Sequence, residues 1–364
     1  MNILMFGQKT IPSRDGGVEI VVEELASRLA KTNNVTVFNR KRKGVKSSKT
    51  YKNINLKDVF TIDKKSLDAI VYAFFSTLKA RSKKYDIIHV HAEGPCFFLW
   101  MLGKHKNKKV IVTIHGLDWQ RGKWGGLASK ILKFGEKQAV KHADEIIVLS
   151  RGVQEYFLKT YNKETTFIPN GVNKPDLLGP NIIKKEYNLG KDSYILFLAR
   201  IVPEKGLDYL IDAWQSMSDD EKKGKKLVIA GGSSHSNSYY ESICSKCKGD
   251  NTIIMTGFVA GNKLVELFSN AYLYVLPSDI EGMPISLLEA MSFGNRCLVS
   301  NITENSDVVR PDYDATFKKG DVVDLKDKMV KLIKDNFSSH QNQYIYKTWE
   351  DVTNETIALY RGCE

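Results

Sequence analysis

The chain has 364 residues, of which 42% are hydrophobic and 10% aromatic, and its net charge is +12. This length predicts two domains, and the composition excludes a largely disordered chain. No stretch is apolar for long enough to span a bilayer, and the apolar start of the chain stops at Gly7, which argues against a secretory signal peptide. Five scattered cysteines predict neither a disulfide framework nor a zinc site, so we expect a cytoplasmic protein.

The charge is concentrated in the first half of the chain. Residues 1–172 hold 31 lysines and arginines against 15 acids, whereas the remainder holds 23 against 27. This asymmetry predicts an anionic partner for the first half, and nucleic acid, an anionic membrane surface or plain solvent exposure all fit it. No helix–turn–helix, zinc or RNA-recognition signature accompanies the charge, so we expect no nucleic acid and keep a basic nucleic-acid-binding protein as a distant alternative.

The first half alternates short apolar strands with amphipathic helices, as in a parallel sheet covered on both faces. A helix is expected over residues 18–30, where Val18, Val21 and Val22 begin an apolar stripe at helical spacing. The expected strands are 2–6, 35–38, 87–91, 110–115 and 145–149. We predict that residues 1–172 form an N-terminal, acceptor-binding Rossmann-like domain.

A second alternating set follows a break in the pattern. Prolines and glycines interrupt residues 173–190, which predicts a linker. Residues 191–340 are expected to form a C-terminal nucleotide-sugar-binding domain of the same kind, and residues 341–364 a helix that packs back on the first domain. The predicted fold is α/β, with two doubly wound Rossmann-like domains facing across a central cleft, where the carboxyl ends of the strands bind ligands.

A Glu-Gly-x-Pro run with a second glutamate eight residues on extends from Glu281 to Glu289. It follows a buried strand, and Pro284 suits the first position of a helix. Backbone N–H groups at that helix start suit a phosphate, and both carboxylates suit sugar hydroxyls. Acids near a helix start are also common because they suit the helix dipole, so the pair alone leaves both interpretations open.

This run resembles glycosyltransferase family 4, whose members have the GT-B fold, and further motifs extend the resemblance over almost the whole chain. Residues 196–206 match a segment in which an arginine and a lysine bind the donor diphosphate, which implies Arg200 and Lys205 here. The chemistry agrees, because a leaving diphosphate needs fixed positive charge. The resemblance makes Glu281 and His115 the other two catalytic candidates, both placed beside the donor sugar.

The resemblance also implies the donor-binding residues. Gly231 and Gly232 would let the backbone approach the nucleotide, Phe258 and Val259 would lie along the base, and Glu289 would hold the ribose. The helix start near the transferred sugar comprises Met283, Pro284, Ile285 and Ser286.

Two regions of the first half are further candidates. Gly16 and Gly17 lack the Gly-x-Gly-x-x-Gly spacing of a dinucleotide site. At the start of a helix they fit either contact with a donor phosphate or a simple tight turn. The segment after His115 resembles a bacterial polysaccharide branch that includes rhamnosyltransferases. The acceptor-side candidates are Asp118, Arg121, His91 and Glu93. His91 and Glu93 are expected to reach the cleft from strand 87–91.

Asp312-Tyr313-Asp314 spells an Asp-x-Asp metal motif, but it lies in a turn-like segment, so we expect no metal and no cofactor. We predict a metal-independent, retaining transferase that moves a hexosyl or deoxyhexosyl group from a UDP-, dTDP- or GDP-sugar to a saccharide, in cell-surface polysaccharide synthesis. Retention follows from the resemblance. A sugar-nucleotide epimerase of the same architecture is the alternative.

Two apolar stretches, 67–78 and 96–102, each precede a basic cluster. That pattern fits contact with an anionic membrane surface, which a lipid-linked acceptor would require, and it predicts a peripheral location on the inner face of the cell membrane. The alternative is that both stretches are buried and merely end in lysines.

Overall fold

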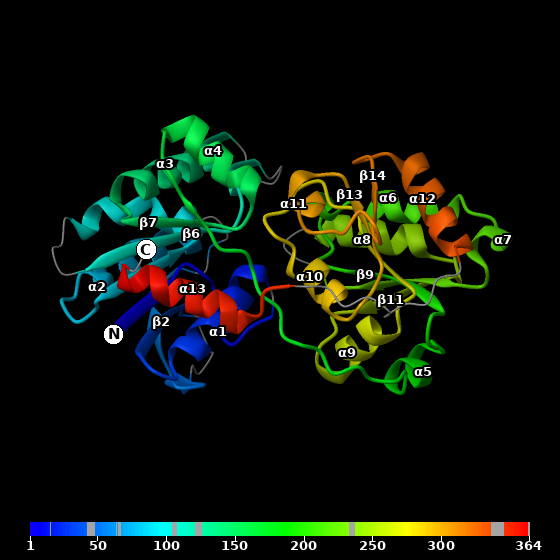
Figure 1. Cartoon of the computed structure of the whole chain (residues 1–364), viewed down its shortest axis with the longest axis horizontal. Helices are drawn as coiled ribbons and strands as arrows, with labels where there is room; N and C mark the ends of the chain where they lie inside the picture. Colours follow the sequence, from blue (N-terminus) through cyan, green and yellow to red (C-terminus); the bar gives the residue numbers. More distant parts are fainter. Residues whose placement is uncertain are drawn as a thin grey trace. The chain divides into compact units, whose positions relative to one another are not determined.

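A computed structural model of the chain describes residues 1–14, 16–41, 48–62, 64, 67–103, 108–120, 126–232, 237–335 and 346–362. The chain divides into two compact units (Figure 1). Unit 1 comprises Met1–Gly171 together with Lys347–Glu364, and unit 2 comprises Val172–Tyr346. Each unit is an α/β domain built on its own sheet.

The sheet of unit 1 has eight strands in the order β3-β4-β2-β1-β5-β6-β7-β8. β3 pairs antiparallel with β4, and the other neighbouring pairs are parallel. The order reverses between β1 and β5, which makes their carboxyl ends the switch point of the sheet. The strands are β1 (Asn2–Phe6), β2 (Asn34–Arg40), β3 (Thr50–Tyr51), β4 (Ile54–Val59), β5 (Ile87–His91), β6 (Lys109–Ile114), β7 (Glu145–Val148) and β8 (Thr166–Phe167).

Alternation along the strands assigns helices to the two faces of this sheet. Ile88 and Val90 of β5 belong to a core that also contains residues of α2, η1, α3 and α4. His89 of β5 points to the opposite face, where it contacts α13, and α13 in turn packs against α1 (Figure 1). The helices are α1 (Gly17–Leu29), α2 (Asp68–Ala80), η1 (Gly94–Leu102), η2 (Asp118–Gln120), α3 (Gly126–His142), α4 (Arg151–Tyr161) and α13 (Trp349–Arg361).

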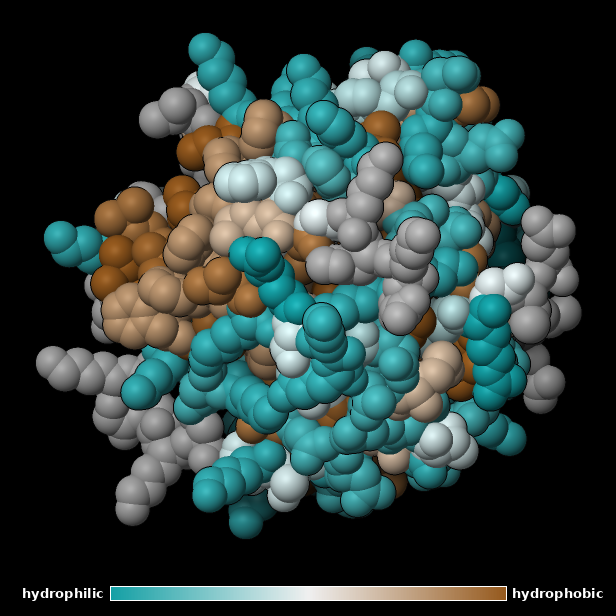
Figure 2. All heavy atoms as spheres, turned by 90° about the vertical axis from the view of Figure 1, so that its left-hand side faces the viewer, coloured by the Kyte–Doolittle hydropathy of each residue, from teal (hydrophilic) through white to brown (hydrophobic). Residues whose placement is uncertain are grey.

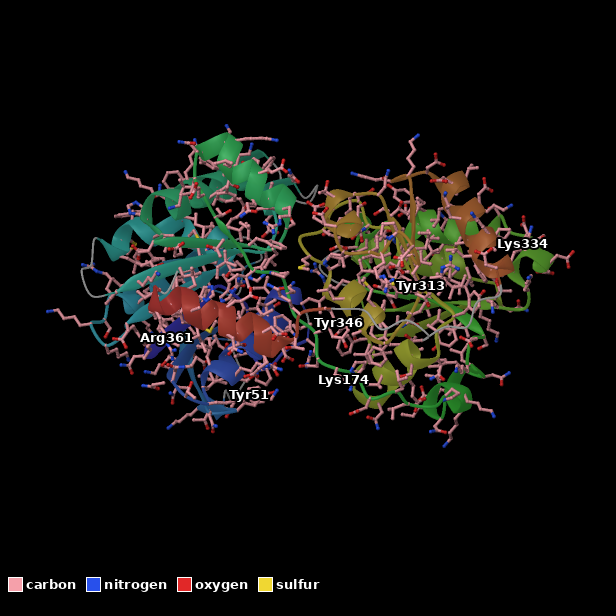
Figure 3. The ribbon with its side chains drawn as sticks, in the orientation of Figure 1. Tyr51, Lys174, Tyr313, Lys334, Tyr346 and Arg361 are labelled. Carbon is pink, nitrogen blue, oxygen red and sulfur yellow. The ribbon has the colours of Figure 1, made fainter. Side chains whose placement is uncertain are left out.

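The final helix, α13, is anchored in unit 1. Thr348 and Asp351 form a capping box at its start, and Lys109 Nζ donates to the carbonyl of Leu359 at 2.7 Å. Figure 3 shows Arg361 at the end of this helix and Tyr51 at the edge of the same unit, where the Tyr51 hydroxyl donates to Glu23 at 2.9 Å. The last helix therefore completes the sheet face that α1 begins.

The sheet of unit 2 is parallel, with six strands in the order β11-β10-β9-β12-β13-β14. Its order reverses between β9 and β12, so the loops after these two strands flank the switch point. The strands are β9 (Tyr194–Leu198), β10 (Lys226–Ala230), β11 (Ile253–Gly257), β12 (Leu273–Leu276), β13 (Cys297–Ser300) and β14 (Ala315–Phe317).

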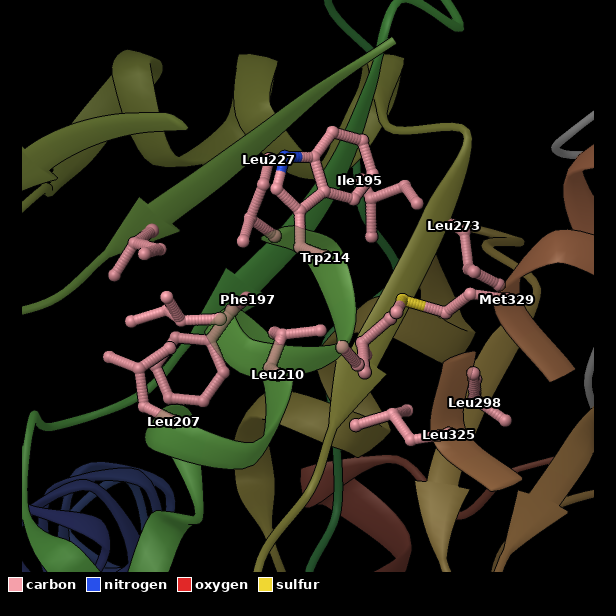
Figure 4. Close-up of a cluster of buried hydrophobic side chains, with 14 of the residues drawn as sticks. Ile195, Phe197, Leu207, Leu210, Trp214, Leu227, Leu273, Leu298, Leu325 and Met329 are labelled. Carbon is pink, nitrogen blue, oxygen red and sulfur yellow. The ribbon is translucent and has the colours of Figure 1, made fainter. Parts of the chain in front are cut away.

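Two cores sandwich this second sheet, because alternate residues of β9 face opposite sides. Ile195 and Phe197 pack with α6, α8 and α12, and Figure 4 shows Trp214 and Met329 pointing into this cluster. Tyr194 and Leu196 pack instead with α5, α9 and α10. The helices are η3 (Pro203–Lys205), α5 (Ile182–Tyr187), α6 (Leu207–Gln215), α7 (Asp219–Lys222), α8 (Asn237–Cys247), α9 (Gly261–Asn270), α10 (Ile285–Ser292), α11 (Thr303–Ser306) and α12 (Val322–Lys334).

The segment that was expected to be a linker, residues 173–190, contains a packed helix. Ile183 of α5 and Leu189 after it are fully buried in unit 2, and the Glu266 carboxylate accepts the N–H groups of Ile182 and Ile183 at 2.7 and 3.0 Å. The helix has six residues and no side-chain cap, so the sequence pattern is too short to reveal it.

Candidate functional site

In unit 2, the loops that follow β9 and β12 lie directly against each other at the switch point. A Cβ atom on Gly206 would come within 2.1 Å of the Pro277 carbonyl oxygen, and Gly206 has a φ of +62°. The N–H of Asp279 also donates to the carbonyl of Glu204 at 3.0 Å. Glycine is required here for the close approach and for the left-handed backbone.

This contact brings Lys205 and Glu281 together. Lys205 Nζ donates to Glu281 Oε1 at 2.5 Å, and Ser278 Oγ donates to the same oxygen at 2.6 Å. The side chains of Lys205 and Glu281 are only 14% and 7% exposed. A nearly buried ion pair is costly to break, because removal of either partner leaves the other charge uncompensated.

Arg200 lies beside this pair in the chain extension that follows β9. Its neighbours Ala199 and Ile201 donate to the carbonyls of Ala230 and Gly232 at 3.2 and 3.1 Å, which holds the backbone on both sides of Arg200. Its side chain is half-buried, and among the described residues no carboxylate forms an ion pair with it. Within the described part of the chain, the charge of this guanidinium is therefore not paired with a carboxylate.

The glycine pair after β10 allows the strand ends to touch. A Cβ atom on Gly231 would come within 1.9 Å of the Ala199 carbonyl oxygen, and the Gly231 N–H donates to Gly257 at 2.9 Å. In the next loop Phe258 is 62% exposed, whereas Val259 belongs to the core. The residues expected to contact the nucleotide thus follow β10 and β11, on the β9 side of the switch point.

Helix α10 starts one residue later than expected, with Pro284 at the N-cap and Ile285 as the first helical residue. Within the described residues no side chain caps this start, and the N–H groups of Leu287 and Leu288 donate to the Pro284 carbonyl at 3.1 and 3.2 Å. The earlier N–H groups of a helix start are the ones that suit an anion. The Ser286 side chain is fixed by a hydrogen bond, because the buried Tyr274 hydroxyl donates to its Oγ at 2.9 Å. Glu289 follows one turn later and is half-buried.

In unit 1, the corresponding loop after β1 contains Gly7 and leads to Gly16 and Gly17. A Cβ atom on Gly7 would lie 2.0 Å from the carbonyl oxygen of His91, so β1 and β5 meet closely at their ends. The Glu19 carboxylate already lies beside Gly16, and it accepts the Lys9 N–H at 2.9 Å. Part of the positive potential at this helix start is thus used inside the protein, and contact of Gly16 and Gly17 with a donor phosphate stays a prediction.

Three histidines form one connected group at the ends of β5 and β6. His89 and His91 stack with their ring centroids 4.2 Å apart, and His91 Nδ1 lies 3.1 Å from His115 Nε2. His89 is bonded at both nitrogens, to Tyr360 of α13 and to Thr113 of β6, each at 2.7 Å. Burial lowers the pKa of His89 to about 3 and that of His91 well below its usual value, so both rings are neutral.

His91 is therefore not an exposed acceptor contact as the sequence pattern suggested. It is fully buried, because side chains two residues apart on β5 face the same side, under α13. Its ring supports His115, which is half-buried directly after β6. Contact of either histidine with a ligand stays a prediction.

Replacing Tyr360 with phenylalanine is expected to lower the free energy of unfolding by about 1–2 kcal/mol, because His89 Nδ1 loses its buried hydrogen-bond partner. Thr113→Val should cost a similar amount from the other nitrogen, and the double variant should cost less than the sum. Urea denaturation of the three variants measures this coupling. Strict additivity would show that the two bonds act independently.

Glu93 is also fully buried, in contact with a second acid. Burial first, and then the carboxylates of Asp118 and Glu136, raise the pKa of Glu93 from 4.5 to about 10. Glu136 accepts three hydrogen bonds, from Trp119 Nε1 at 3.2 Å, from the Tyr156 hydroxyl at 2.8 Å and from the Tyr161 hydroxyl. The carboxyl group of Glu93 is thus protonated at neutral pH and lies near Asp118. It is buried and does not line an open surface.

Several residues of these groups were not identified from the sequence. Ser278 lies inside the glutamate motif and could have been recognised by its position three residues before Glu281. Glu136 is the sole acid of α3, among lysines, a pattern that resembles ordinary surface charge. Tyr360 carries no signal, because its partner is 271 residues away. Arg121 lies outside the described residues, as do Lys123 and Trp124.

The Asp-x-Asp segment has structural contacts. Asp314 accepts the N–H groups of Cys297 and Arg310 at 2.8 and 2.9 Å, and Asp312 forms an ion pair with Arg310. Over the described ranges no group of three or more histidine, cysteine or acidic side chains is arranged to hold a metal ion. In the same ranges no helix is both long and apolar enough to cross a bilayer.

Comparison with known proteins identifies the class of protein to which these two units belong. The family model described as "Glyco_transf_4: Glycosyltransferase Family 4" matches residues 15–174, and "Glycosyl transferases group 1" matches residues 180–350. An uncharacterized glycosyltransferase of Methanocaldococcus jannaschii is 26% identical over 300 residues, which cover 76% of this chain and 75% of the relative. A UDP-Gal:alpha-D-GlcNAc-diphosphoundecaprenol alpha-1,3-galactosyltransferase of Escherichia coli is 24% identical over 68% of this chain and 64% of the relative.

Solved structures agree on the fold. Sucrose-phosphate synthase of Thermosynechococcus elongatus superposes with a TM-score of 0.79 at 19% identity, over 99% of this chain and 98% of that one. The HepE protein of Anabaena, in complex with UDP-glucose, gives a TM-score of 0.76 at 15% identity, over 99% and 95%. The fold and the matched segments define a glycosyltransferase of the GT-B class, and this confirms the predicted fold class. The chain belongs to glycosyltransferase family 4.

Proposed function

We propose that this glycosyltransferase moves a hexosyl or deoxyhexosyl group, with retention, from a nucleoside-diphosphate sugar to a saccharide hydroxyl. The observation that carries the proposal is the Lys205–Glu281 pair at the switch point of unit 2, next to Arg200 and the uncapped start of α10. Positive charge and N–H donors suit a diphosphate, and carboxylates suit sugar hydroxyls. Retention rests on the family resemblance.

Each residue has a defined role in this proposal. Arg200, Lys205 and the first N–H groups of α10 stabilise the negative charge that grows on the leaving diphosphate. Glu281 orients the donor sugar while it is held by Lys205 and Ser278, and Glu289 binds the ribose. His115 of unit 1 contacts the sugar. These groups balance the leaving charge without a metal ion, so transfer should persist in EDTA.

The relatives guide the choice of substrates. UDP-sugars are the first donors to test, because the Escherichia coli relative is named for UDP-Gal and the Anabaena structure holds UDP-glucose. The name of the first also includes a diphosphoundecaprenol-linked acceptor, which supports a lipid-linked saccharide as the acceptor here. A dTDP- or GDP-sugar, and with it rhamnosyl transfer, remains in the panel because no described residue selects the base.

Ligand-induced thermal shifts test the donor site. A nucleotide at about 100 times its dissociation constant should add about 2.7 kcal/mol to the stability of the folded state, a shift of several degrees. We expect one of UDP, dTDP and GDP to give this shift, Arg200→Ala to abolish it, and duplex DNA to give none. A shift with DNA alone would overturn the assignment.

The rival epimerase reaction is separated by product analysis. A transferase releases the nucleoside diphosphate only when it finds an acceptor hydroxyl, apart from slow hydrolysis. An epimerase instead interconverts sugar nucleotides or releases a changed sugar without any acceptor. Chromatography of the donor, with and without a saccharide acceptor, distinguishes the two, and acceptor-independent epimerisation would sink the transferase proposal.

A further inference from the structure

Helix α2 of unit 1 turns a mixed face to the core, with Tyr72, Ala73 and Ala80 beside two polar residues. Its buried face includes Ser76 and Thr77, which are both 0% exposed. Larger apolar residues lie outside this face: Leu67 is 44% and Leu78 42% exposed, Phe74 is partly buried, and Phe75 is partly buried at the edge of the core. A soluble amphipathic helix normally turns such residues inward, so this outer face is suited to an apolar partner.

The outward aromatic side chains continue across three neighbouring elements, where α2 packs on η1 and η1 on α3. Successive ring centroids lie 5.4, 5.2, 5.4, 4.9 and 4.7 Å apart. We call these six residues the aromatic row; in order they are Phe60, Phe75, Phe74, Phe98, Phe97 and Phe134.

The ends of the row, and Trp100 beside it, are open to solvent. Phe60 is 52% exposed, Phe134 40% and Trp100 54%. Figure 2 shows the side of unit 1 on which α2 lies, and there hydrophobic side chains form one continuous area bordered by hydrophilic ones. Isolated exposed apolar residues are ordinary, but a continuous area of this kind marks an interaction surface.

The border of this area is basic. Lysines and one arginine extend from the end of α2 and along the outer side of α3, and all of them are exposed: Lys79, Arg81, Lys83, Lys84, Lys130, Lys133, Lys137 and Lys141. The two acids of these helices are withdrawn, since Asp68 is ion-paired with Arg40 at 2.6 Å and Glu136 is buried. The surface is therefore apolar at its centre and positive at its edge.

We propose that this surface docks on an anionic lipid bilayer, with the aromatic row in the interfacial region and the lysines on the headgroups. Aromatic rings favour that region, and each nearby basic side chain adds about 1 kcal/mol. A second copy of the chain is a poorer occupant, because an isologous pair would set the lysines of one copy against those of the other.

The surface adjoins the edge of unit 1 that carries its candidate residues. Phe60 directly follows β4, and η1 begins next to Glu93. The α3 residue Glu136 contacts the carboxyl group of Glu93. A docked unit 1 would present this edge at the headgroup level, where the sugar of a lipid-linked acceptor lies. This consequence for acceptor choice rests on the proposed function, but the docking itself does not.

Vesicle co-sedimentation tests the proposal. We expect the protein to bind phosphatidylcholine vesicles that contain phosphatidylglycerol, and to bind pure phosphatidylcholine much less. Trp100→Ala/Phe134→Ala should weaken binding about tenfold, because the removed side chains are those that insert. The matched control Leu177→Ala/Val323→Ala removes residues of unit 2 that are 59% and 68% exposed, and it should bind like the wild type.

A second pair of variants separates charge from insertion. Lys130→Glu/Lys137→Glu should abolish the preference for phosphatidylglycerol, and added salt should reproduce that loss in the wild type. Thermal denaturation of each variant checks that it is folded. Equal binding by Trp100→Ala/Phe134→Ala and the control would overturn the proposal, and so would a dimer in sedimentation velocity that this double variant abolishes while vesicles stay unbound.

The docking and the transferase proposals fail in different ways. With a water-soluble saccharide acceptor, the Trp100→Ala/Phe134→Ala variant should transfer as fast as the wild type. With an acceptor embedded in vesicles it should be slower by about the factor lost in binding. If no donor is used with either acceptor, the proposed function fails while the vesicle result stands.

Discussion

Lys205→Ala is expected to slow sugar transfer by about 100- to 1,000-fold, the range seen when one group that stabilises transition-state charge is removed. The ammonium would no longer neutralise the leaving diphosphate, and Glu281 would be left as an unpaired, nearly buried carboxylate. Both consequences act on the same step. Steady-state kinetics with the donor found in the thermal-shift panel measures the effect.

The matched control is a second lysine–glutamate pair in the same unit. Lys263 Nζ lies 2.5 Å from Glu186 Oε2, the same separation as in the site pair, but these side chains are 28% and 42% exposed. Lys263→Ala should therefore leave both transfer and stability nearly unchanged, because an exposed ion pair contributes little. If the two alanine variants transferred equally well, Lys205 would have no part in the chemistry.

Ser278 provides a finer test of what holds Glu281. Ser278→Ala removes the second donor to Oε1 and leaves the ion pair in place. Because Ser278 is fully buried and carries no charge, its loss should reduce transfer far less than the loss of Lys205. The comparison separates orientation of the carboxylate from compensation of charge.

The unit 2 site could be predicted from sequence because its parts are local. Arg200, Lys205 and the run from Glu281 to Glu289 each follow an apolar strand, and parallel strands bring such loops to one edge. Two facts required the structure. The contact between Lys205 and Glu281 depends on Gly206 fitting against Pro277, and the start of α10 depends on backbone angles that place Pro284 at the cap.

Unit 1 was less predictable, because its decisive contacts connect distant parts of the chain. The burial of His91 follows from α13 covering the sheet, and nothing near β5 encodes that cover. In α2 the hydrophobic pattern leaves two interpretations open, buried core or interface, since the helix is apolar on most sides. Its buried face combines Tyr72, Ala73 and Ala80 with Ser76 and Thr77, so hydropathy alone does not identify the side that packs inward.

Raising the pH from about 7 to about 8 is expected to destabilise unit 1. Among its described carboxyl groups, Glu93 alone should cause this effect. The folded state keeps this proton up to a pKa of about 10, whereas the unfolded chain releases it near 4.5. The contribution of Glu93 is thus fully favourable below pH 4.5 and is lost as the pH rises toward 10. In between, the free energy of unfolding falls by up to about 1.4 kcal/mol per pH unit.

Other groups limit the useful window. His89 stays neutral in the folded state because burial lowers its pKa to about 3, so it acts with the opposite sign and only below about pH 6.5. Burial raises the pKa of the Cys96 thiol, which gives the same sign as Glu93 once an unfolded thiol ionises near about 8.5. Measurements between these limits therefore isolate the carboxyl group.

Glu93→Gln keeps the shape of the side chain and removes its titration, so its unfolding free energy should be nearly independent of pH across that window. Glu136→Leu should instead cost about 3 kcal/mol at every pH, because it leaves the Trp119, Tyr156 and Tyr161 donors unpaired. Chemical denaturation, with hydrogen exchange of α3 to report on unit 1, measures both. If Glu93→Gln kept the wild-type slope, the retained proton would belong to another group, and the assignment of a neutral Glu93 would be wrong.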